Sequence, residues 1–485
     1  MALGQVDYGL MGVVGGLTAF IGFFNGILAG SISRFYAFSV GMAQKSGNED
    51  AGLEECRRWF SVAVSVHTVV PVVLMAIGYP LGMYAVEHWL TIPSDRVCDC
   101  VWVFRFVCMT CFLGMISIPF NAMYGAKQLI AELTIYSFVT STLNVVFLYY
   151  MITHPGIWLV KYAFWTCVLS IVPSLIISGR ALFCFPECKI RRKHLWNLAD
   201  ICELVSFAGW NLFGATGNLL KGAGMTVLVN KFFGPVQNAA VSIANTVAGH
   251  SQSLAGSMVG AFMPAITNAC GAGDRQRMVS LVHQTCKYGA LLVLPFALPL
   301  ALEIDEVMVL WLKNPPAQSG ILCIWMMAVL VLENMTTGHY VVVAANGKIA
   351  WYQFVVGTLF VMTLPLTWIM MRFGMGLYSV GYALFTTLSI VAFVRIVAVK
   401  VLIGISPRYW INRILLPILL VVAVATATGW STRLLAGPSF GRLFLTTGVC
   451  ELILLPLAWF LVLDGEERNF IKSKIKVAIG KFCNA

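Results

Sequence analysis

The sequence predicts an all-α polytopic membrane protein with about 13 transmembrane helices. The chain has 485 residues, of which 59% are hydrophobic and only 11% are charged, whereas soluble proteins carry about 25% charged residues. Its apolar segments are ~20 residues long, the length that a helix needs to cross hydrocarbon. Backbone polar groups in lipid need partners within the segment, so such segments must be helical. The strands of a membrane barrel would be shorter and would alternate in polarity.

Thirteen apolar segments follow one another along the chain. We expect spans at 8–31, 61–84, 101–124, 129–151, 158–177, 205–229, 236–263, 287–302, 320–340, 351–371, 377–399, 415–434 and 443–463. The connecting loops are too short for a folded domain outside the membrane, and no Walker loop, haem pair or clustered metal-ligand spacing occurs. We therefore expect a protein that is not an enzyme and has no cofactor and no metal.

The charged residues predict how the chain is oriented. The odd-numbered loops and the C-terminal tail hold 23 of the 32 Lys and Arg residues, and the even-numbered loops hold six. Cytoplasmic loops are enriched in Lys and Arg, so we expect the C-terminus in the cytoplasm and the N-terminus outside. The net charge of +11 then reflects membrane topology and does not indicate nucleic-acid binding.

Two features indicate that the sequence is duplicated. Trp89-Leu90 and Trp311-Leu312 follow corresponding spans. Lys127 and Lys348 lie 221 residues apart, and each precedes the next apolar span. Nearly equal offsets at two separate places are typical of a repeat, here a parallel one.

The repeat predicts how the chain is organised. We expect an N-terminal lobe of five spans (1–183), a basic cytoplasmic linker (184–202), a C-terminal lobe of six spans (203–404), two additional spans (405–464) and a basic amphipathic tail (465–485). A basic amphipathic helix is attracted to anionic lipid, so the tail is expected to lie on the inner leaflet.

Polar side chains within the spans are the candidates for ligand binding, because they are costly in hydrocarbon and usually face a cavity or another helix. On the first, sixth and seventh spans such residues recur every three or four positions, the spacing of one helix face. The candidate substrate-binding residues are Asn25, Arg34, Arg105, Asn211, Asn218, Lys221, Asn245, His250 and Gln252. The alternative is close helix packing through small residues and amides.

Lys221 is the strongest candidate, since it lies too deep in its span for the amine to reach either surface. A cation in a cavity would attract phosphate or another acidic group. The alternative is an ion pair with Glu333 or Glu451. Arg105 could simply extend to the outer surface, and topology alone could explain Arg34. Glu333 lies in mid-span, where it could couple ion movement or form a structural pair.

Short motifs occur in a defined order along most of the chain. They are LGQVDYG (3–9), RF (34–35), IPFNA (118–122), PEC (186–188), GWNLFG (209–214), FGPV (233–236) and GAGD (271–274). In this order they resemble bacterial polysaccharide (O-antigen type) flippases, which belong to the multidrug/oligosaccharidyl-lipid/polysaccharide exporter superfamily.

The resemblance implies fourteen helices, in two six-helix lobes and an extra pair, with both termini cytoplasmic. It implies alternating-access transfer of a polyprenyl-pyrophosphate-linked oligosaccharide to the outer leaflet of the bacterial inner membrane. That step serves cell-surface polysaccharide synthesis, where contacts with other assembly proteins are expected. Arg34, Arg105 and Lys221 would line a central cavity. The family's first helix is missing, so we expect a start codon upstream of Met1 or a truncation.

Two other functions stay open on the sequence alone. A multidrug or cation antiporter of the same superfamily should favour acidic groups in its cavity and does not need two extra helices. A membrane glycosyltransferase or polysaccharide polymerase would need catalytic carboxylates or histidines on large external loops. The sequence identifies neither the glycan, nor the coupling ion, nor the oligomeric state.

Overall fold

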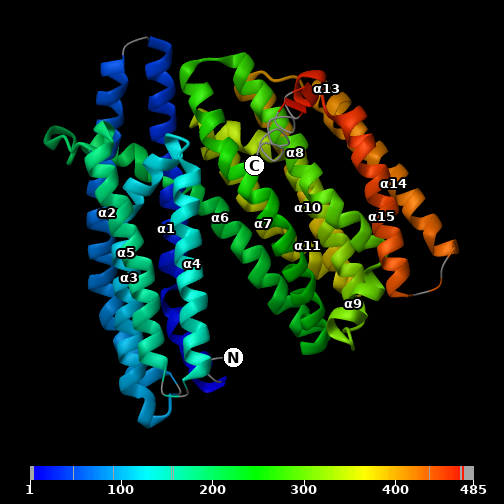
Figure 1. Cartoon of the computed structure of the whole chain (residues 1–485), viewed down its shortest axis with the longest axis horizontal. Helices are drawn as coiled ribbons and strands as arrows, with labels where there is room; N and C mark the ends of the chain where they lie inside the picture. The colour runs from blue at the N-terminus through cyan, green and yellow to red at the C-terminus, as the bar shows by residue number, and fades with distance from the viewer. Residues whose placement is uncertain are drawn as a thin grey trace, which may run out of the picture. The chain divides into compact units, whose positions relative to one another are not determined.

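The structure is a computed structural model that describes residues 5–46, 49–90, 92–154, 156, 158–435, 437, 439–469 and 472–473. Within these ranges the chain is almost entirely helical and contains no β-strand (Figure 1). The predicted all-α fold is therefore confirmed. Most of the predicted amphipathic tail lies outside the described residues.

The helices follow the apolar segments closely. In the described part of the chain they are α1 (Gln5–Ser46), α2 (Glu49–Tyr84), α3 (Val97–Ala126), α4 (Ile130–Thr153), α5 (Leu159–Cys184), α6 (Leu198–Phe233), α7 (Pro235–Ala272), α8 (Arg275–Leu302), α9 (Ile304–Leu312), α10 (Ser319–Asn346), α11 (Ala350–Arg372), α12 (Tyr378–Ile403), α13 (Pro407–Trp410), α14 (Leu416–Leu435) and α15 (Phe440–Leu457). Two π-helical turns extend the last pair, η5 (Ile411–Leu415) before α14 and η6 (Ala458–Val462) after α15.

Each of the thirteen predicted spans lies in one of these helices. When the π-helical turns are included, no span extends beyond its helix by more than one residue. Among the described residues, ten helical segments are long and apolar enough to cross a membrane by length and composition. Helices α6 and α7 are not among the ten. On both of them the sequence shows regularly spaced polar and small residues.

The chain divides into two compact units. Unit 1 comprises Met1–Leu212 and Thr267–Arg275, and unit 2 comprises Phe213–Ile266 and Gln276–Ala485. The division therefore falls inside α6 and α7, whereas the predicted lobes meet in the linker 184–202. The predicted domain boundaries stay a prediction.

The order of the helices repeats along the chain. Helices α3, α4 and α5 of unit 1 begin at residues 97, 130 and 159, and helices α10, α11 and α12 of unit 2 begin at residues 319, 350 and 378. Corresponding helices thus start 219 to 222 residues apart, which agrees with the offset of the sequence motifs. These three helices of unit 1 therefore have identifiable counterparts in unit 2.

In unit 1 the basic linker packs on the first turns of α2. The carboxylate of Glu54 forms ion pairs with Arg191 at 3.1 Å and with Lys193 at 3.3 Å. The backbone N–H of Arg191 donates a hydrogen bond of 2.8 Å to the Ser61 hydroxyl. The linker predicted from composition is thus held against the helix bundle of its own unit.

A buried carboxylate joins the start of α6 to α2. Asp200 accepts two hydrogen bonds from the Arg58 guanidinium, of 2.5 Å from Nη2 and 2.8 Å from Nε, and one of 2.9 Å from the Asn197 amide. The Arg58 guanidinium holds the pKa of the Asp200 carboxyl below its usual value of 3.8. Bidentate contacts of this kind combine charge with fixed geometry.

In unit 2 a buried ion pair attaches the last two helices. Glu303, fully buried after α8, accepts hydrogen bonds from Arg442 of α15 at 2.7 Å and from Thr446 at 2.8 Å. At the other end of α15, the buried Lys287 of α8 pairs with Asp464 at 2.5 Å. The additional helix pair is therefore tied to the rest of unit 2 by these two ion pairs.

Replacing Arg442 with leucine should destabilise unit 2. Breaking a buried ion pair leaves an uncompensated charge and costs about 3–5 kcal/mol, so Arg442→Leu should lower the unfolding temperature in detergent clearly. The matched control is Arg408→Ala, because Arg408 is exposed. Equal unfolding temperatures for Arg442→Leu and the wild type would contradict the assigned role of the pair.

The Asp200–Arg58 contact should make stability depend on pH. Because the folded-state pKa of Asp200 is lowered, its contribution is present above the unfolded-state pKa and is lost as the pH falls. Wild-type protein should therefore lose more thermal stability than Asp200→Asn between about pH 5 and about pH 3. Parallel pH profiles of the two proteins would show that the contact contributes nothing.

Candidate functional site

In unit 2, close contact between α6 and α11 positions Lys221. A Cβ atom on Gly217 would lie 2.5 Å from the carbonyl oxygen of Gly357, and one on Gly224 would lie 2.4 Å from Leu364 Cδ1. At Gly217 the neighbouring atoms are backbone, so only glycine fits there, and small residues are what allow membrane helices to approach. Lys221 lies between these two glycines on α6 and is thereby brought to α11.

The amine of Lys221 lies against an aromatic ring. Its Nζ atom is 4.5 Å from the centre of the Phe360 ring, a cation–π distance, and the residue is half-buried. Within the described residues it has no ion pair with Glu333 or Glu451. The ion pair considered from the sequence is therefore not seen, and the ammonium is left without a carboxylate at contact distance.

Glu333 is instead paired with Arg395 of α12. The two charges are 3.6 Å apart, and Arg395 is 8% exposed by its side chain. The guanidinium also donates hydrogen bonds to the Tyr352 hydroxyl at 3.2 Å and to the Thr336 hydroxyl at 3.1 Å. A buried charge is stable when it is paired and hydrogen-bonded. Glu333 pairs with the Arg395 guanidinium, and Tyr352 and Thr336 accept its hydrogen bonds.

These groups give the interior of unit 2 an excess of positive charge. Glu333 and Arg395 both act electrostatically on Lys221. One carboxylate and two cations leave one positive charge uncompensated within this set. Charges interact more strongly where water is excluded, so this region favours an acidic group over a second cation.

The other candidate residues of unit 2 make no contact with the Lys221 and Arg395 groups among the described interactions. Asn218 of α6, and Asn245 and His250 of α7, are exposed. Gln252 accepts a hydrogen bond of 3.1 Å from the Asn334 amide of α10. For Gln252 the alternative of an amide that joins two helices therefore describes the contact that is seen.

The predicted residues of unit 1 lie on different helices. Arg34 is buried, and Asn211 donates a hydrogen bond of 3.4 Å to the Ser31 hydroxyl. Asn25 has a buried side-chain oxygen for which the described part of the chain supplies no hydrogen-bond partner. Arg105 of α3 is exposed and lies over the Trp102 ring at 4.9 Å, so it is not grouped with Arg34.

Aromatic rings surround the guanidinium of Arg34. Its central carbon is 4.8 Å from the centre of the Phe35 ring, 5.1 Å from Phe207 and 5.3 Å from Phe38. Guanidinium groups stack on aromatic faces more readily than ammonium groups do. This packing allows a cation to remain in a buried, largely apolar position.

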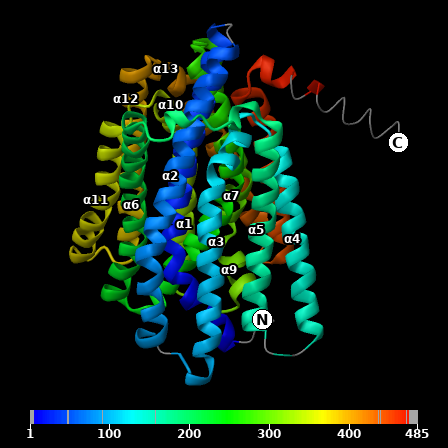
Figure 2. The ribbon, with the colours of Figure 1, turned by 90° about the vertical axis from the view of Figure 1, so that its left-hand side faces the viewer.

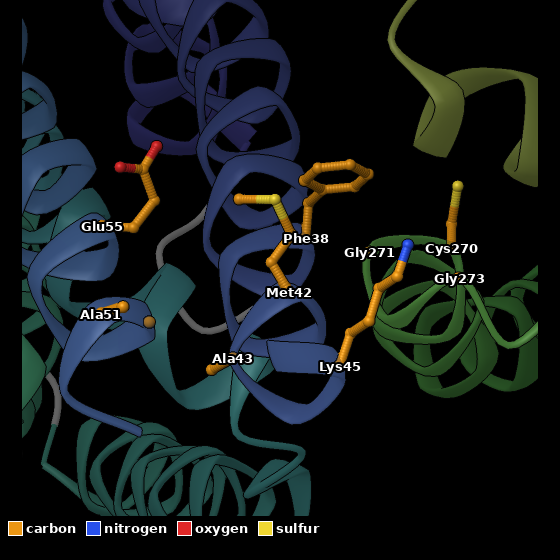
Figure 3. A pocket seen from close by; sticks show the side chains of 10 residues that line it. Phe38, Met42, Ala43, Lys45, Ala51, Glu55, Cys270, Gly271 and Gly273 are labelled. Carbon is orange, nitrogen blue, oxygen red and sulfur yellow. The ribbon is translucent and has the colours of Figure 1, made fainter. Parts of the chain in front are cut away.

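A pocket of about 670 Å³ adjoins this cluster at one end of unit 1 (Figure 3). Phe38, Met42 and Lys45 at the end of α1 line it together with the start of α2 and the last residues of α7. The Lys45 amine lies beside Gly273, while Glu55 on the opposite wall is bonded to Arg58. The pocket therefore combines an apolar wall with one exposed amine.

The described residues contain no group of three or more His, Cys, Asp or Glu side chains that could hold a metal ion. The Arg395 network was missed by sequence reasoning, although a signal was present. Arg395 lies inside the predicted span 377–399 and should have been treated as an intramembrane charge. The contacts of Tyr352 and Phe360 had no sequence signal, since aromatic residues are common throughout the spans.

Comparison with known proteins identifies the fold. No family model and no curated protein matches the chain, but several solved structures do. A MATE transporter in complex with MaL6 aligns with a TM-score of 0.65 at 13% identity, over 83% of this chain and 91% of that one. The eukaryotic MATE transporter AtDTX14 aligns with a TM-score of 0.61 at 13% identity, over 84% and 93%.

A third match is a MOP-superfamily transporter from Pyrococcus furiosus, for which a reverse polarity of the binding pocket suggests a different function. It aligns with a TM-score of 0.65 at 16% identity, over 83% of this chain and 91% of that one. At these identities the likeness shows the fold alone, which is that of MATE and MOP-superfamily transporters. It agrees with the superfamily indicated by the motifs, and does not single out the O-antigen flippases within it.

Removing the Tyr352 hydroxyl should weaken the Arg395 network without changing the packing of the ring. Hydrogen bonds to charged groups contribute about 1.5–3 kcal/mol, so Tyr352→Phe should lower the free energy of unfolding by that amount. Tyr378→Phe is the control, because that side chain is 41% exposed. Denaturant titration in mixed micelles measures both, and equal losses in the two variants would refute the assignment.

Proposed function

We propose that this chain is an ion-coupled antiporter that moves amphiphilic organic compounds across the membrane by alternating access. The proposal is supported by the MATE fold, which extends over more than four fifths of the chain. One of the similar structures is a multidrug resistance transporter in an outward-facing conformation. This support favours the antiporter hypothesis over the flippase that the motifs suggested.

The observation that carries the proposal is the Glu333–Arg395 pair in the interior of unit 2. At 3.6 Å the carboxylate is close enough to be stabilised by the guanidinium. Of the two partners, the carboxyl is the one that can serve as a proton carrier, since a guanidinium keeps its proton. Intramembrane carboxylates of this kind are typical of ion-coupling sites.

Protonation of Glu333 would change the charge balance of the site. The neutral carboxyl no longer compensates Arg395, whose hydrogen bonds to Tyr352 and Thr336 remain. A proton and a substrate that both interact with this charge set then alter each other's affinity reciprocally. Antiport follows if each ligand favours a different one of the two access states.

A second candidate function is favoured by Lys221. An ammonium without a carboxylate at contact distance would bind the pyrophosphate of a lipid-linked oligosaccharide, the substrate implied by the sequence motifs. The Pyrococcus furiosus transporter, with its reversed pocket polarity, is a precedent for a superfamily member with a different function. In this hypothesis Lys221 contacts the acidic headgroup.

Transport into proteoliposomes separates the two functions. With a pH gradient, wild-type protein should accumulate fluorescent amphiphilic compounds. Glu333→Gln should abolish the response to the gradient, because the amide cannot exchange a proton. The control is Glu306→Gln, since Glu306 lies outside this network and is bonded to Arg442.

The outcomes are distinguishable. Leaflet transfer of a polyprenyl-pyrophosphate glycan, lost in Lys221→Met and accompanied by no accumulation of amphiphiles, would replace the antiporter by the flippase. Gradient-driven accumulation that is unchanged in Glu333→Gln would remove Glu333 from the coupling mechanism. Inactivity of wild-type protein toward both substrate classes would contradict both functions.

A further inference from the structure

The linker of unit 1 is fixed at the level where α2 enters its apolar span. The Arg57 guanidinium donates a hydrogen bond of 2.9 Å to the Pro186 carbonyl, and the Ser61 hydroxyl accepts one of 2.8 Å from the backbone N–H of Arg191. Ser61 is the first residue of the predicted span 61–84. The linker therefore crosses α2 at the boundary of the apolar segment, near one end of the helix (Figure 2).

The acidic residues of the linker are neutralised by the helix bundle. Glu187 pairs with Lys127, directly after α3, at 2.7 Å, and Asp200 pairs with Arg58 of α2 at 2.5 Å. The sequence of the linker contains no other Asp or Glu. The basic residues of the linker are therefore not compensated by carboxylates of the linker itself.

The basic residues of the linker also exceed their carboxylate partners on α2. Arg191 and Lys193 share the single carboxylate of Glu54. Lys189 and Arg192 are exposed and form no ion pair among the described residues. This part of unit 1 thus presents an excess of positive charge at the boundary of an apolar span, which is where a bilayer has its phosphate groups.

The backbone turns part of the linker away from α2. Arg191 is extended, with φ −106° and ψ 107°, and successive side chains of an extended backbone point to opposite sides. Because the Arg191 side chain contacts Glu54, the side chains of Ile190 and Arg192 lie on the side away from α2. Both are exposed. A basic and an apolar side chain therefore share the outward side of the linker.

Large apolar side chains flank these residues. Phe183 at the end of α5 is 91% exposed, and Trp196 and Leu198 at the start of α6 are 69% and 74% exposed. Exposed apolar groups of this size are typical of contact with a membrane or another protein, and tryptophan is enriched where lipid meets water. Because the linker joins two helices that contain predicted spans, lipid is the surface nearest to these side chains.

From these observations we infer that the linker binds the headgroups of anionic phospholipids in the leaflet that it faces. The contact is made by a linker surface that consists of Lys189, Ile190, Arg192 and Trp196. The two cations contact lipid phosphates, while the two apolar side chains lie among the glycerol and upper acyl groups. A zwitterionic lipid binds less well, because its own cation is repelled by the same basic residues.

Lipid-selective quenching of Trp196 fluorescence tests the proposal. The full-length protein is reconstituted into bilayers of equal parts phosphatidylglycerol and phosphatidylcholine, with bromine on the acyl chains of one lipid or the other. The chain has 14 tryptophans, so the signal of Trp196 is the difference between the protein and its Trp196→Phe variant. Brominated phosphatidylglycerol should quench this signal more strongly than brominated phosphatidylcholine, because the basic residues enrich the anionic lipid around Trp196.

A charge-matched pair of double variants tests the role of the two cations. Lys189→Gln/Arg192→Gln should lose the difference between the two brominated lipids. Lys348→Gln/Arg408→Gln removes the same residue types from exposed positions of unit 2 and should keep the difference. Each double variant is compared with its own Trp196→Phe derivative, and thermal unfolding shows that each has folded. A difference that survives Lys189→Gln/Arg192→Gln would contradict the assignment.

Three other results would overturn the proposal. Equal quenching by the two brominated lipids in the wild type would mean that the linker does not select anionic lipid. Absence of quenching by either lipid would mean that water or another protein covers Trp196. Potassium phosphate that reduces the difference more than potassium chloride of equal ionic strength would show that the linker binds the free ion. These readouts do not depend on transport, so failure of the antiporter proposal would leave them unchanged.

Discussion

A charged side chain in hydrocarbon needs a counter-charge, hydrogen-bond partners or an aromatic face, and this requirement organises the interior of both units. Glu303 meets it through Arg442, and Glu333 meets it through Arg395. Arg34 meets it through a cluster of phenyl rings. Each of these groups holds two or more helices in a defined arrangement, because the partners come from different helices or from distant turns.

Lys221 satisfies the requirement only in part. Its ammonium has the Phe360 ring beside it, and the nearby carboxylate of Glu333 is paired with Arg395. An acidic group that binds beside this ammonium would stabilise it. In the two proposed functions, Glu333 would exchange a proton and Lys221 would bind an anion.

Glycine contacts set the positions of these groups. Gly217 and Gly224 bring α6 so close to α11 that Lys221 reaches Phe360. In unit 1, the counterpart helix α4 packs mainly on α5. The two units thus share a repeat, but α4 of unit 1 is less buried than its counterpart α11 in unit 2.

The sequence was sufficient to predict the helices, because a ~20-residue apolar run in lipid has only one stable backbone arrangement. It was sufficient to mark Lys221 and Glu333, since isolated charges are conspicuous in apolar runs. It could not show which cation pairs with Glu333. That choice depends on the contact between α10 and α12, and Arg395 was counted as a loop charge. The contacts of the predicted linker with α2 could not be predicted either, because they depend on tertiary structure.

The central claim is that one carboxylate, Glu333, couples ion movement to substrate binding. Proton exchange on adding substrate to purified protein in weakly buffered solution, measured over a range of pH, tests this claim most directly. Linkage between the two sites predicts that substrate binding changes the number of protons bound by the wild type and does not change it in Glu333→Gln. Equal proton exchange by the two proteins, with equal substrate binding, would contradict the account.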